Sequence, residues 1–233
     1  MSDSTEVLLR HDVDKRPDCS LRLARIEAEM GVRSIYYFRT VPESLDEGAL
    51  RQISRLGHEI GYHYESLTTC NGNVEAAYQD FCQNLNRLSN IVSSPIATIC
   101  MHGSPRSPYD SKDIWQHYDY RPLGIDFEPY FDTDFSQTLY ITDTGRRWDG
   151  YRVSVRDKIP QYQDKWNAEG LVFHTTSQVI DSLQEISGKY PRLMVTTHPQ
   201  RWLPFGVGWC KELGLQNIKN IIKGVKVSFS SSK

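Results

Sequence analysis

Two aspartates near the start of the chain are the first residues whose spacing points to chemistry. Asp12 and Asp14 follow the apolar run Val7-Leu8-Leu9. In a β-strand, residues two apart point to the same side, so both carboxylates converge where this strand leaves the core. Two like charges so close are unfavourable unless a cation lies between them. The pattern suggests a metal site at the end of a first strand; the alternative is a polar turn in which Asp14 caps a helix.

The elements that must position these residues follow a regular order. Hydrophobic periodicity predicts strands near 7–13, 33–38, 58–63 and 96–101, alternating with helices near 17–30, 42–56 and 74–95. In the first helix the expected buried stripe is Cys19, Leu23, Ile26 and Met30. Short connections between alternating strands and helices imply a parallel sheet with helical crossovers.

The second half of the chain is harder to interpret. It shows one strand near 138–141, a helix near 177–186 and a strand at 192–197, whereas the stretch 104–156 has no clear order. A short helix from residue 210 and a last strand at 225–227 are expected in the tail. We expect one domain covering residues 1–233.

Histidines occur where three of the predicted strands end. His63, His102 and His198 stand at or just after such ends, as Asp12 and Asp14 do. In α/β proteins of this type, active sites lie at the C-terminal ends of the strands. Aspartate and histidine without cysteine form a donor set that suits zinc, iron, manganese or cobalt. Asp14 and His63 are the firmest candidate ligands. His11 and His58 are expected to be structural.

Composition excludes several classes of protein. With 27 basic and 29 acidic residues, a net charge of -2 argues against a nucleic-acid or membrane-surface protein. No apolar run approaches the length of a membrane span, and the polar N-terminus lacks the features of a secretory signal. The five cysteines form no C-x-x-C pair, which indicates a reducing compartment, and we expect a cytoplasmic protein.

Taken together, these motifs resemble the polysaccharide deacetylase (NodB-homology, carbohydrate esterase family 4) family. The resemblance is carried by Asp12-Val13-Asp14, by the run from Gly57 to His63 (GHEIGYH), and by Thr197-His198-Pro199. It implies a distorted (β/α) barrel and the metal-dependent removal of acyl groups from N-acyl sugars. We expect a divalent metal, zinc before iron, manganese or cobalt. By the family's pattern Asp12 is the catalytic base, Asp14 and His63 bind the metal, and His198 is the general acid. A later aromatic motif matches Asp143 to Trp148, and we expect Asp143, Arg147 and Trp148 to contact the substrate.

The chain departs from the family's pattern in the middle of the expected site. The family usually has a second ligand histidine four residues after the first, where this chain has Leu67. His102 or Glu65 could replace it, and we prefer His102 because a strand end aims at the site. The arginine that usually orients the catalytic aspartate is also missing from its place. Arg10, Arg106 or Arg147 could substitute, and the sequence does not choose among them.

The expected function is metal-dependent removal of an N-acyl group, acetyl or else formyl, from an amino sugar. The absence of an export signal favours a small precursor, such as a nucleotide- or lipid-linked intermediate of lipopolysaccharide or other surface-polysaccharide biosynthesis. Two alternatives are a carbohydrate-binding barrel that has lost activity, which Leu67 would explain, and an amidase acting on a non-sugar cyclic amide. No nucleic-acid partner is expected, and the oligomeric state is open.

Overall fold

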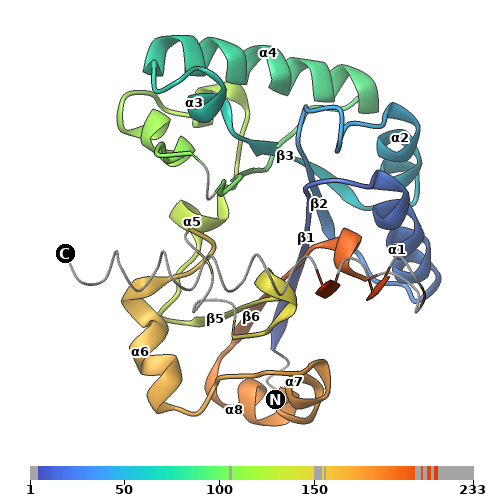
Figure 1. Cartoon of the computed structure of the whole chain (residues 1–233), viewed down its shortest axis with the longest axis vertical. Coiled ribbons are helices and arrows are strands. Elements are labelled where there is room, and N and C mark those ends of the chain that lie inside the picture. The colour runs from blue at the N-terminus through green and yellow to red at the C-terminus, as the bar shows by residue number, and fades with distance from the viewer. Residues whose placement is uncertain are drawn as a thin grey trace. The chain divides into compact units, whose positions relative to one another are not determined.

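The structure is a computed structural model that describes residues 5–104, 107–149, 154, 156–202, 206, 209–210 and 213–214. The chain divides into two compact units. One comprises His11–Thr133, here called the ligand unit, and the other comprises Met1–Arg10 and Asp134–Lys233, here called the second unit. Figure 1 labels the helices and strands of both units.

The ligand unit alternates strands and helices, as the sequence predicts. Its elements are the end of β1 (Glu6–Val13), α1 (Pro17–Glu29), β2 (Ile35–Phe38), α2 (Glu47–Arg55), β3 (Glu59–Tyr64), α3 (Ser66–Thr69), α4 (Val74–Val92), β4 (Ile99–Met101), the 3-10 helices η1 (Ser111–Gln116) and η2 (Arg121–Leu123), and α5 (Pro129–Asp132). The strands lie in the order β4-β3-β2-β1. Strands β2, β3 and β4 are parallel, so their C-terminal ends share one edge.

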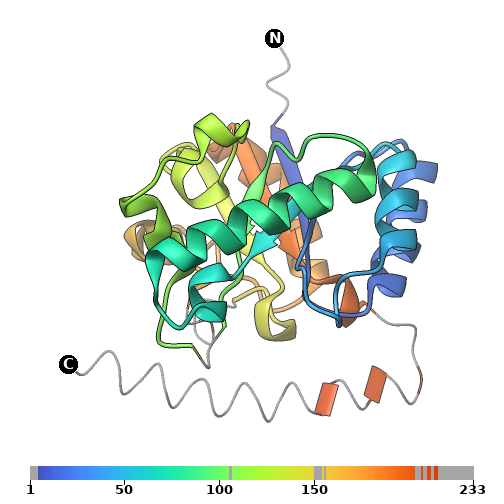
Figure 2. The same cartoon turned by 90° about the horizontal axis from the view of Figure 1, so that it is seen from above.

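Local sequence explains where the helices of this unit begin. The side chain of Asp46 accepts a hydrogen bond from the Ala49 amide at the start of α2, and Asn73 does the same for Ala76 at the start of α4. Helix α2 packs beside both α1 and α4, as Figures 1 and 2 show. Helices α2 and α4 also contact β3.

Two glycines in the run from Gly57 to His63 have backbone roles. Gly57 follows α2 with φ of 89°, a left-handed conformation that favours glycine. Gly61 lies under the ring of Tyr37, because an added Cβ would come within 2.4 Å of that ring. Tyr37 in turn shares a hydrogen bond with Thr98. The glycines therefore let β3 pack closely against its neighbours and bring His63 to the edge of the sheet.

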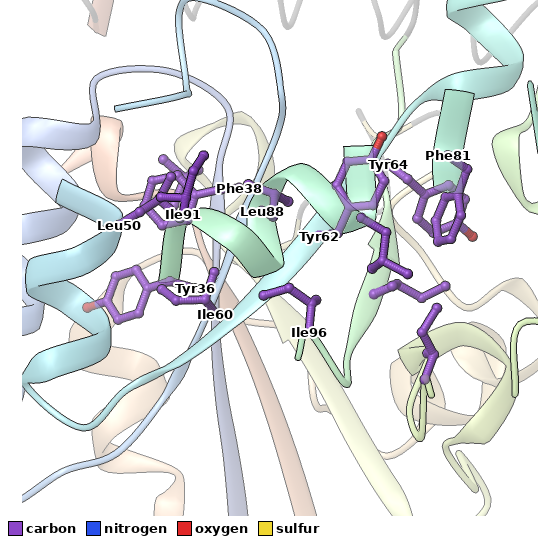
Figure 3. Close-up of a cluster of buried hydrophobic side chains, with 14 of the residues drawn as sticks. Tyr36, Phe38, Leu50, Ile60, Tyr62, Tyr64, Phe81, Leu88, Ile91 and Ile96 are labelled. Carbon is purple, nitrogen blue, oxygen red and sulfur yellow. The ribbon is translucent and has the colours of Figure 1, made fainter. Parts of the chain in front are cut away.

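The core of the ligand unit lies between the strands and helices α2 and α4. Figure 3 shows the cluster, in which Tyr62 and Tyr64 contact Phe81 of α4 with ring centroids 5.2 and 5.4 Å apart. Each fully buried apolar side chain contributes about 1.5–3 kcal/mol to folding. This core fixes the strand ends from which the candidate site is built.

Helix α1 buries a different face from the one that its apolar spacing predicts. Ile26 and Met30 of the expected stripe are exposed, and the buried residues are Cys19, Ser20, Ala24 and Glu27. The reason is a buried polar network. Glu27 accepts hydrogen bonds from the Ser34 and Tyr36 hydroxyls at 2.6 and 2.7 Å, and its other oxygen lies 2.7 Å from His11 Nε2.

The second unit contains the start of β1 and the elements of the later chain. These are β5 (Thr138–Thr142), the 3-10 helix η3 (Thr144–Arg146), α6 (Pro160–Ala168), α7 (Thr176–Asp181), α8 (Leu183–Lys189), β6 (Arg192–Thr197) and the 3-10 helix η5 (Pro199–Arg201). Strands β5 and β6 are parallel, with Thr138 opposite Arg192, and β6 is hydrogen-bonded to β1.

Several expectations for this half need correction. The single helix expected near 177–186 is two short helices, α7 and α8, and helix α6 was not expected. Strands β5 and β6 are confirmed. The strand expected at 225–227 and most of the tail helix lie outside the described residues. Within the described part of the chain, every helix is too short or too polar to cross a membrane.

Candidate active site

Four neighbouring strands of the ligand unit deliver the candidate site. The residues that directly follow β1, β2, β3 and β4 are, in order, Asp14, Arg39, Glu65 and His102. His63 is the next-to-last residue of β3. Because the strands are parallel neighbours, these five side chains start from one edge of the sheet.

Asp14, His63 and His102 come together as a possible set of metal ligands. Oδ1 of Asp14 lies 3.6 Å from Nε2 of His63 and 3.5 Å from Nε2 of His102. One ligand atom from each residue lies within 4.8 Å of the others. Two ligand atoms bound to one zinc ion at the tetrahedral angle are about 3.4 Å apart. The distances from Asp14 to the two histidine nitrogens therefore fit a tetrahedral zinc-type ion.

The hydrogen bonds of the two histidines determine which nitrogen faces the aspartate. Nδ1 of His63 lies 2.9 Å from the carbonyl oxygen of Cys100, and Nδ1 of His102 lies 3.0 Å from Oε2 of Glu65. Both partners are acceptors, so Nδ1 carries the proton in each neutral ring and Nε2 has a lone pair. Two imidazole nitrogens with lone pairs, each within 3.6 Å of one carboxylate oxygen, favour a bound cation. The residues present thus fit a divalent metal.

Glu65 supports His102 instead of facing Asp14. Its Oε1 accepts hydrogen bonds from Nη2 and Nε of Arg39 at 2.6 and 2.9 Å. Burial raises the pKa of Glu65, but the hydrogen bond from His102 and the charge of Arg39 outweigh it and lower the pKa. Of the two residues considered for the third ligand position, the structure brings His102 Nε2 to Asp14 and turns Glu65 toward Arg39.

Leu67 belongs to a hydrophobic cluster. It lies in α3, is 4% exposed, and packs with Ala77 of α4 and Ile114 of η1. The position that usually carries the family's second histidine is therefore part of the core packing of this chain.

Asp12 lies beside the three candidate ligands. Its side chain is buried, and Oδ2 is 3.9 Å from Nε2 of His63. Cys100, which stands opposite His63 in the β3–β4 register, completes a second close group with Asp12 and His63. Sequence spacing gave no signal for this thiol, because Cys100 belongs to no C-x-x-C pair.

In the second unit, His198 forms a close pair with Asp143. Nδ1 of His198 lies 2.6 Å from Oδ1 of Asp143, and the His198 amide donates to Oδ2 at 3.1 Å. Arg201 and Trp202 also donate to the Asp143 carboxylate, at 2.9 and 2.8 Å. Burial raises the pKa of Asp143, but the charges of His198 and Arg201 outweigh it, so the pKa is lowered. Nη1 of Arg201 also lies 2.8 Å from Nδ1 of His198, so Asp143 and Arg201 together fix the orientation of this ring.

This pairing gives Asp143 a role that the sequence did not indicate. Asp143 was expected to contact substrate, yet its carboxylate is buried and engaged by His198, Arg201 and Trp202. Trp202, also missed, is 48% exposed, and its ring centroid is 6.4 Å from that of Trp148. The only sequence signal for Arg201 and Trp202 was their position just after the strand that ends before His198.

The other expected substrate residues lie on the same segment. Trp148 is half-buried and donates from Nε1 to the Thr176 hydroxyl at 3.0 Å. Arg147 makes a two-pronged ion pair with the buried carboxylate of Asp149, at 2.7 and 2.8 Å. His174 Nδ1 approaches the same carboxylate at 3.3 Å. The aromatic surface of Trp148 and the partly exposed Arg147 are thus accessible to a ligand.

The remaining polar residues singled out from the sequence have structural positions. His58 is buried, with Nε2 2.8 Å from the Ala24 carbonyl oxygen, and His11 lies beside Glu27, so both are structural as predicted. Among the candidate substitutes for the orienting arginine, Arg10 is fully buried. Burial raises the pKa of Asp157, but the charge of His198 and, after it, the charge of Arg10 lower this pKa overall. Arg106 lies outside the described residues.

Among comparisons with known proteins, only the comparison of structures finds similar proteins. No family model matches the sequence, and no curated protein matches it significantly. The catalytic domain of a peptidoglycan N-acetylglucosamine deacetylase from Eubacterium rectale is similar in structure, with a TM-score of 0.52 at 13% identity over 93% of this chain and 85% of that one. A carbohydrate esterase family 4 (CE4) esterase from Streptococcus mutans has a TM-score of 0.50 at 14% identity over 94% and 82%.

The resemblance expected from the sequence motifs is confirmed at the level of the fold. Both similar structures cover nearly the whole of this chain, including both of its compact units. The chain has the distorted (β/α) fold of the carbohydrate esterase family 4 polysaccharide deacetylases.

Proposed function

We propose that this protein is a metal-dependent hydrolase that removes an N-acyl group from an amino sugar. The observation that carries the proposal is the meeting of Asp14, His63 and His102 at one strand edge, with Asp12 beside them. Two imidazoles and one carboxylate leave room for a water and a substrate oxygen, as catalytic sites require. A deacetylase-type fold supports the same reading.

Asp14, His63 and His102 are the residues that would hold the metal. We propose zinc, since two nitrogen donors and one oxygen donor at this spacing suit it; iron, manganese and cobalt accept the same donors. When bound, such an ion supplies Lewis acidity, which lowers the pKa of water and favours negative charge on the acyl oxygen.

Two side chains would move the protons of the reaction. Asp12 accepts a proton from the attacking water as the water oxygen bonds to the acyl carbon. His198 donates a proton to the sugar nitrogen as the C–N bond breaks, because an amine anion is too unstable to leave. The products are a carboxylic acid and a free amino sugar. Asp143 keeps His198 oriented.

The substrate is proposed from the chemistry of accessible side chains. Trp148, paired with Trp202, offers an aromatic face for a sugar ring, and Arg147 offers a cation for a nucleotide or lipid pyrophosphate. We propose a cytoplasmic, small N-acetylated or N-formylated amino-sugar precursor of a surface polysaccharide, acted on by the whole chain as one catalytic domain.

The test combines metal content with product release. Purified protein is expected to carry about one zinc or similar ion per chain and to release acetate from a nucleotide-linked N-acetylamino sugar or from chito-oligosaccharides. His63→Ala should lose both metal and activity. His117→Ala, which alters an exposed histidine of the same unit, is the control and should lose neither.

Three results would overturn the proposal or direct it elsewhere. Substoichiometric metal together with no activity and retained sugar binding would indicate a barrel that has lost catalysis. Release of amine from cyclic ureides but not from N-acyl sugars would indicate a different amidase. Full activity after chelation would exclude a metal-dependent reaction.

A further inference from the structure

We infer that Arg39 and Glu65 form a positioning pair that holds His102 as a metal ligand. The inference rests on the proposed metal site and extends it to two residues that do not themselves contact the metal. It starts from a continuous series of hydrogen bonds: Arg39 donates to Oε1 of Glu65, and Oε2 of Glu65 accepts from Nδ1 of His102. At the end of this series Nε2 of His102 lies 3.5 Å from Asp14.

The guanidinium of Arg39 connects two parts of the site. Its Nε and Nη2 donate to one carboxylate oxygen of Glu65, while Nη1 donates to the backbone carbonyl of Asp14 at 3.2 Å. One planar group thus fixes the backbone of one candidate ligand and, through Glu65, the side chain of another. Lysine has a single nitrogen and could not make this set of contacts.

Burial separates this ion pair from the surface pairs of the same unit. The side chains of Arg39 and Glu65 are 18% and 14% exposed, whereas those of the pair Arg51–Glu47 are 46% and 52% exposed. Exposed pairs contribute little to stability. The Arg39–Glu65 pair is partly buried, and the second carboxylate oxygen of Glu65 accepts a hydrogen bond from His102. We therefore assign this pair to the orientation of His102.

Glu65 can orient His102 because the histidine ring has two nitrogens, either of which can carry the proton. Without Glu65, His102 can carry its proton on Nε2, or rotate and turn Nδ1 toward Asp14. In either case Nε2 is no longer held ready as a donor of its lone pair. Residues that orient a ligand histidine in this way change metal affinity by about 10- to 100-fold when they are removed.

This arrangement also accounts for the apolar residue at position 67. The third ligand comes from the end of β4, and the segment after β3 supplies its support through Glu65. Leu67, two residues further on, packs into the cluster with Ala77. The chain thus uses the segment after β3 to orient a ligand on the next strand.

The experiment measures zinc affinity and the protonated nitrogen of His102 separately. Zinc affinity is measured by competition with a chelator at fixed pH for wild type, Glu65→Ala, Glu65→Gln and Arg39→Met. The tautomer of His102 is read in metal-free protein from nitrogen-15 chemical shifts, with His102→Gln for assignment. Glu47→Ala is the matched control, because it removes an exposed carboxylate that also pairs with an arginine.

We expect Glu65→Ala to weaken zinc binding by about 10- to 100-fold and to shift His102 away from the Nδ1–H form. Glu65→Gln keeps an acceptor oxygen and should give a smaller loss in both readouts, and it remains informative if the alanine variant does not fold. Arg39→Met should weaken zinc binding in the same direction, and Glu47→Ala should match wild type.

The outcomes separate the inference from the proposed function. Wild-type protein that binds zinc, with Glu65→Ala and Arg39→Met equal to it within about twofold, overturns the positioning pair and leaves the metal site standing. An unchanged His102 tautomer in Glu65→Ala also overturns it. If the wild type binds no divalent ion, the proposed function fails and the inference fails with it.

Discussion

Introducing histidine at position 67 should not rebuild the site. The test is Leu67→His in a His102→Ala background. A zinc site worth about 10–16 kcal/mol over four ligands implies about 2.5–4 kcal/mol per ligand, so His102→Ala should weaken zinc binding about 10²- to 10³-fold. Leu67 packs in the cluster with Ala77 and Ile114, so we expect a histidine there to leave the affinity at that reduced level.

The same change should lower stability. Leu67 is 4% exposed, and its burial contributes about 1.5–3 kcal/mol. An imidazole in its place loses part of this burial free energy. It also buries polar nitrogens, which costs about 1–3 kcal/mol. We therefore expect Leu67→His to lower the free energy of unfolding in urea by about 2–5 kcal/mol. Leu67→Met, which nearly conserves volume, is the control and should change it by less than about 1.5 kcal/mol.

Recovery of zinc affinity would refute this reasoning. If the double variant binds zinc within about tenfold of wild type, a side chain at position 67 reaches the metal, and the placement of α3 is wrong. A Leu67→His variant as stable as wild type would contradict the packing argument independently. Both quantities come from the same purified proteins, by urea titration and by chelator competition.

Three further predictions concern protons. Asp12→Asn should keep its metal but lose turnover by about 10²- to 10⁴-fold, and unchanged initial rates would exclude Asp12 as the base. Asp143→Asn removes the carboxylate that orients His198, so turnover should fall while the bound metal is unchanged; an unchanged rate would contradict the pairing. Burial raises the pKa of Glu27, but its contacts with His11 and neighbouring hydroxyls lower it below 4.5 overall, so its stabilising contribution is present above pH 4.5 and is lost as the pH falls through the lowered pKa. Urea unfolding at pH 7 and pH 3 should therefore show a difference between wild type and Glu27→Gln that shrinks on acidification.

The order of strands and helices in the ligand unit could be predicted because local patterns determine it. Alternating apolar runs and short connections imply parallel strands, and parallel strands bring their C-terminal ends to one edge. That alone placed Asp14, His63 and His102 near one another. Arg39 directly follows β2 as Asp14 follows β1, and this position was the available signal for its role.

Contacts between side chains could not be predicted in the same way. Spacing does not show that Glu65 turns toward Arg39 or that Asp143 accepts from His198, because such pairs depend on tertiary hydrogen bonds. The prediction of which face of α1 is buried was wrong for a related reason. A carboxylate with three polar partners can be buried, so Glu27 lies inside and Ile26 outside.

The stretch 104–156 could not be ordered from its sequence for a different reason. Its described part is made of 3-10 helices, a four-residue helix and one strand, joined by turns. Elements this short contain too few residues to show a helical or strand period. Their positions are set by contacts such as that of Trp115 Nε1 with the Tyr64 hydroxyl, which link residues 51 positions apart.

The placement of one polar residue just beyond each of four adjacent strands has a consequence for how such a site can diverge. Neighbouring strand ends are interchangeable starting points for a ligand, so a histidine can be lost from the segment after one strand and gained after the next without any change in the scaffold. Such an exchange alters the ligand's place in the sequence from four residues after His63 to 39 residues after it, at His102. Proteins of this architecture can therefore retain a metal site while the motif that marks it disappears, and a short motif becomes a poor criterion for deciding which of them have lost activity.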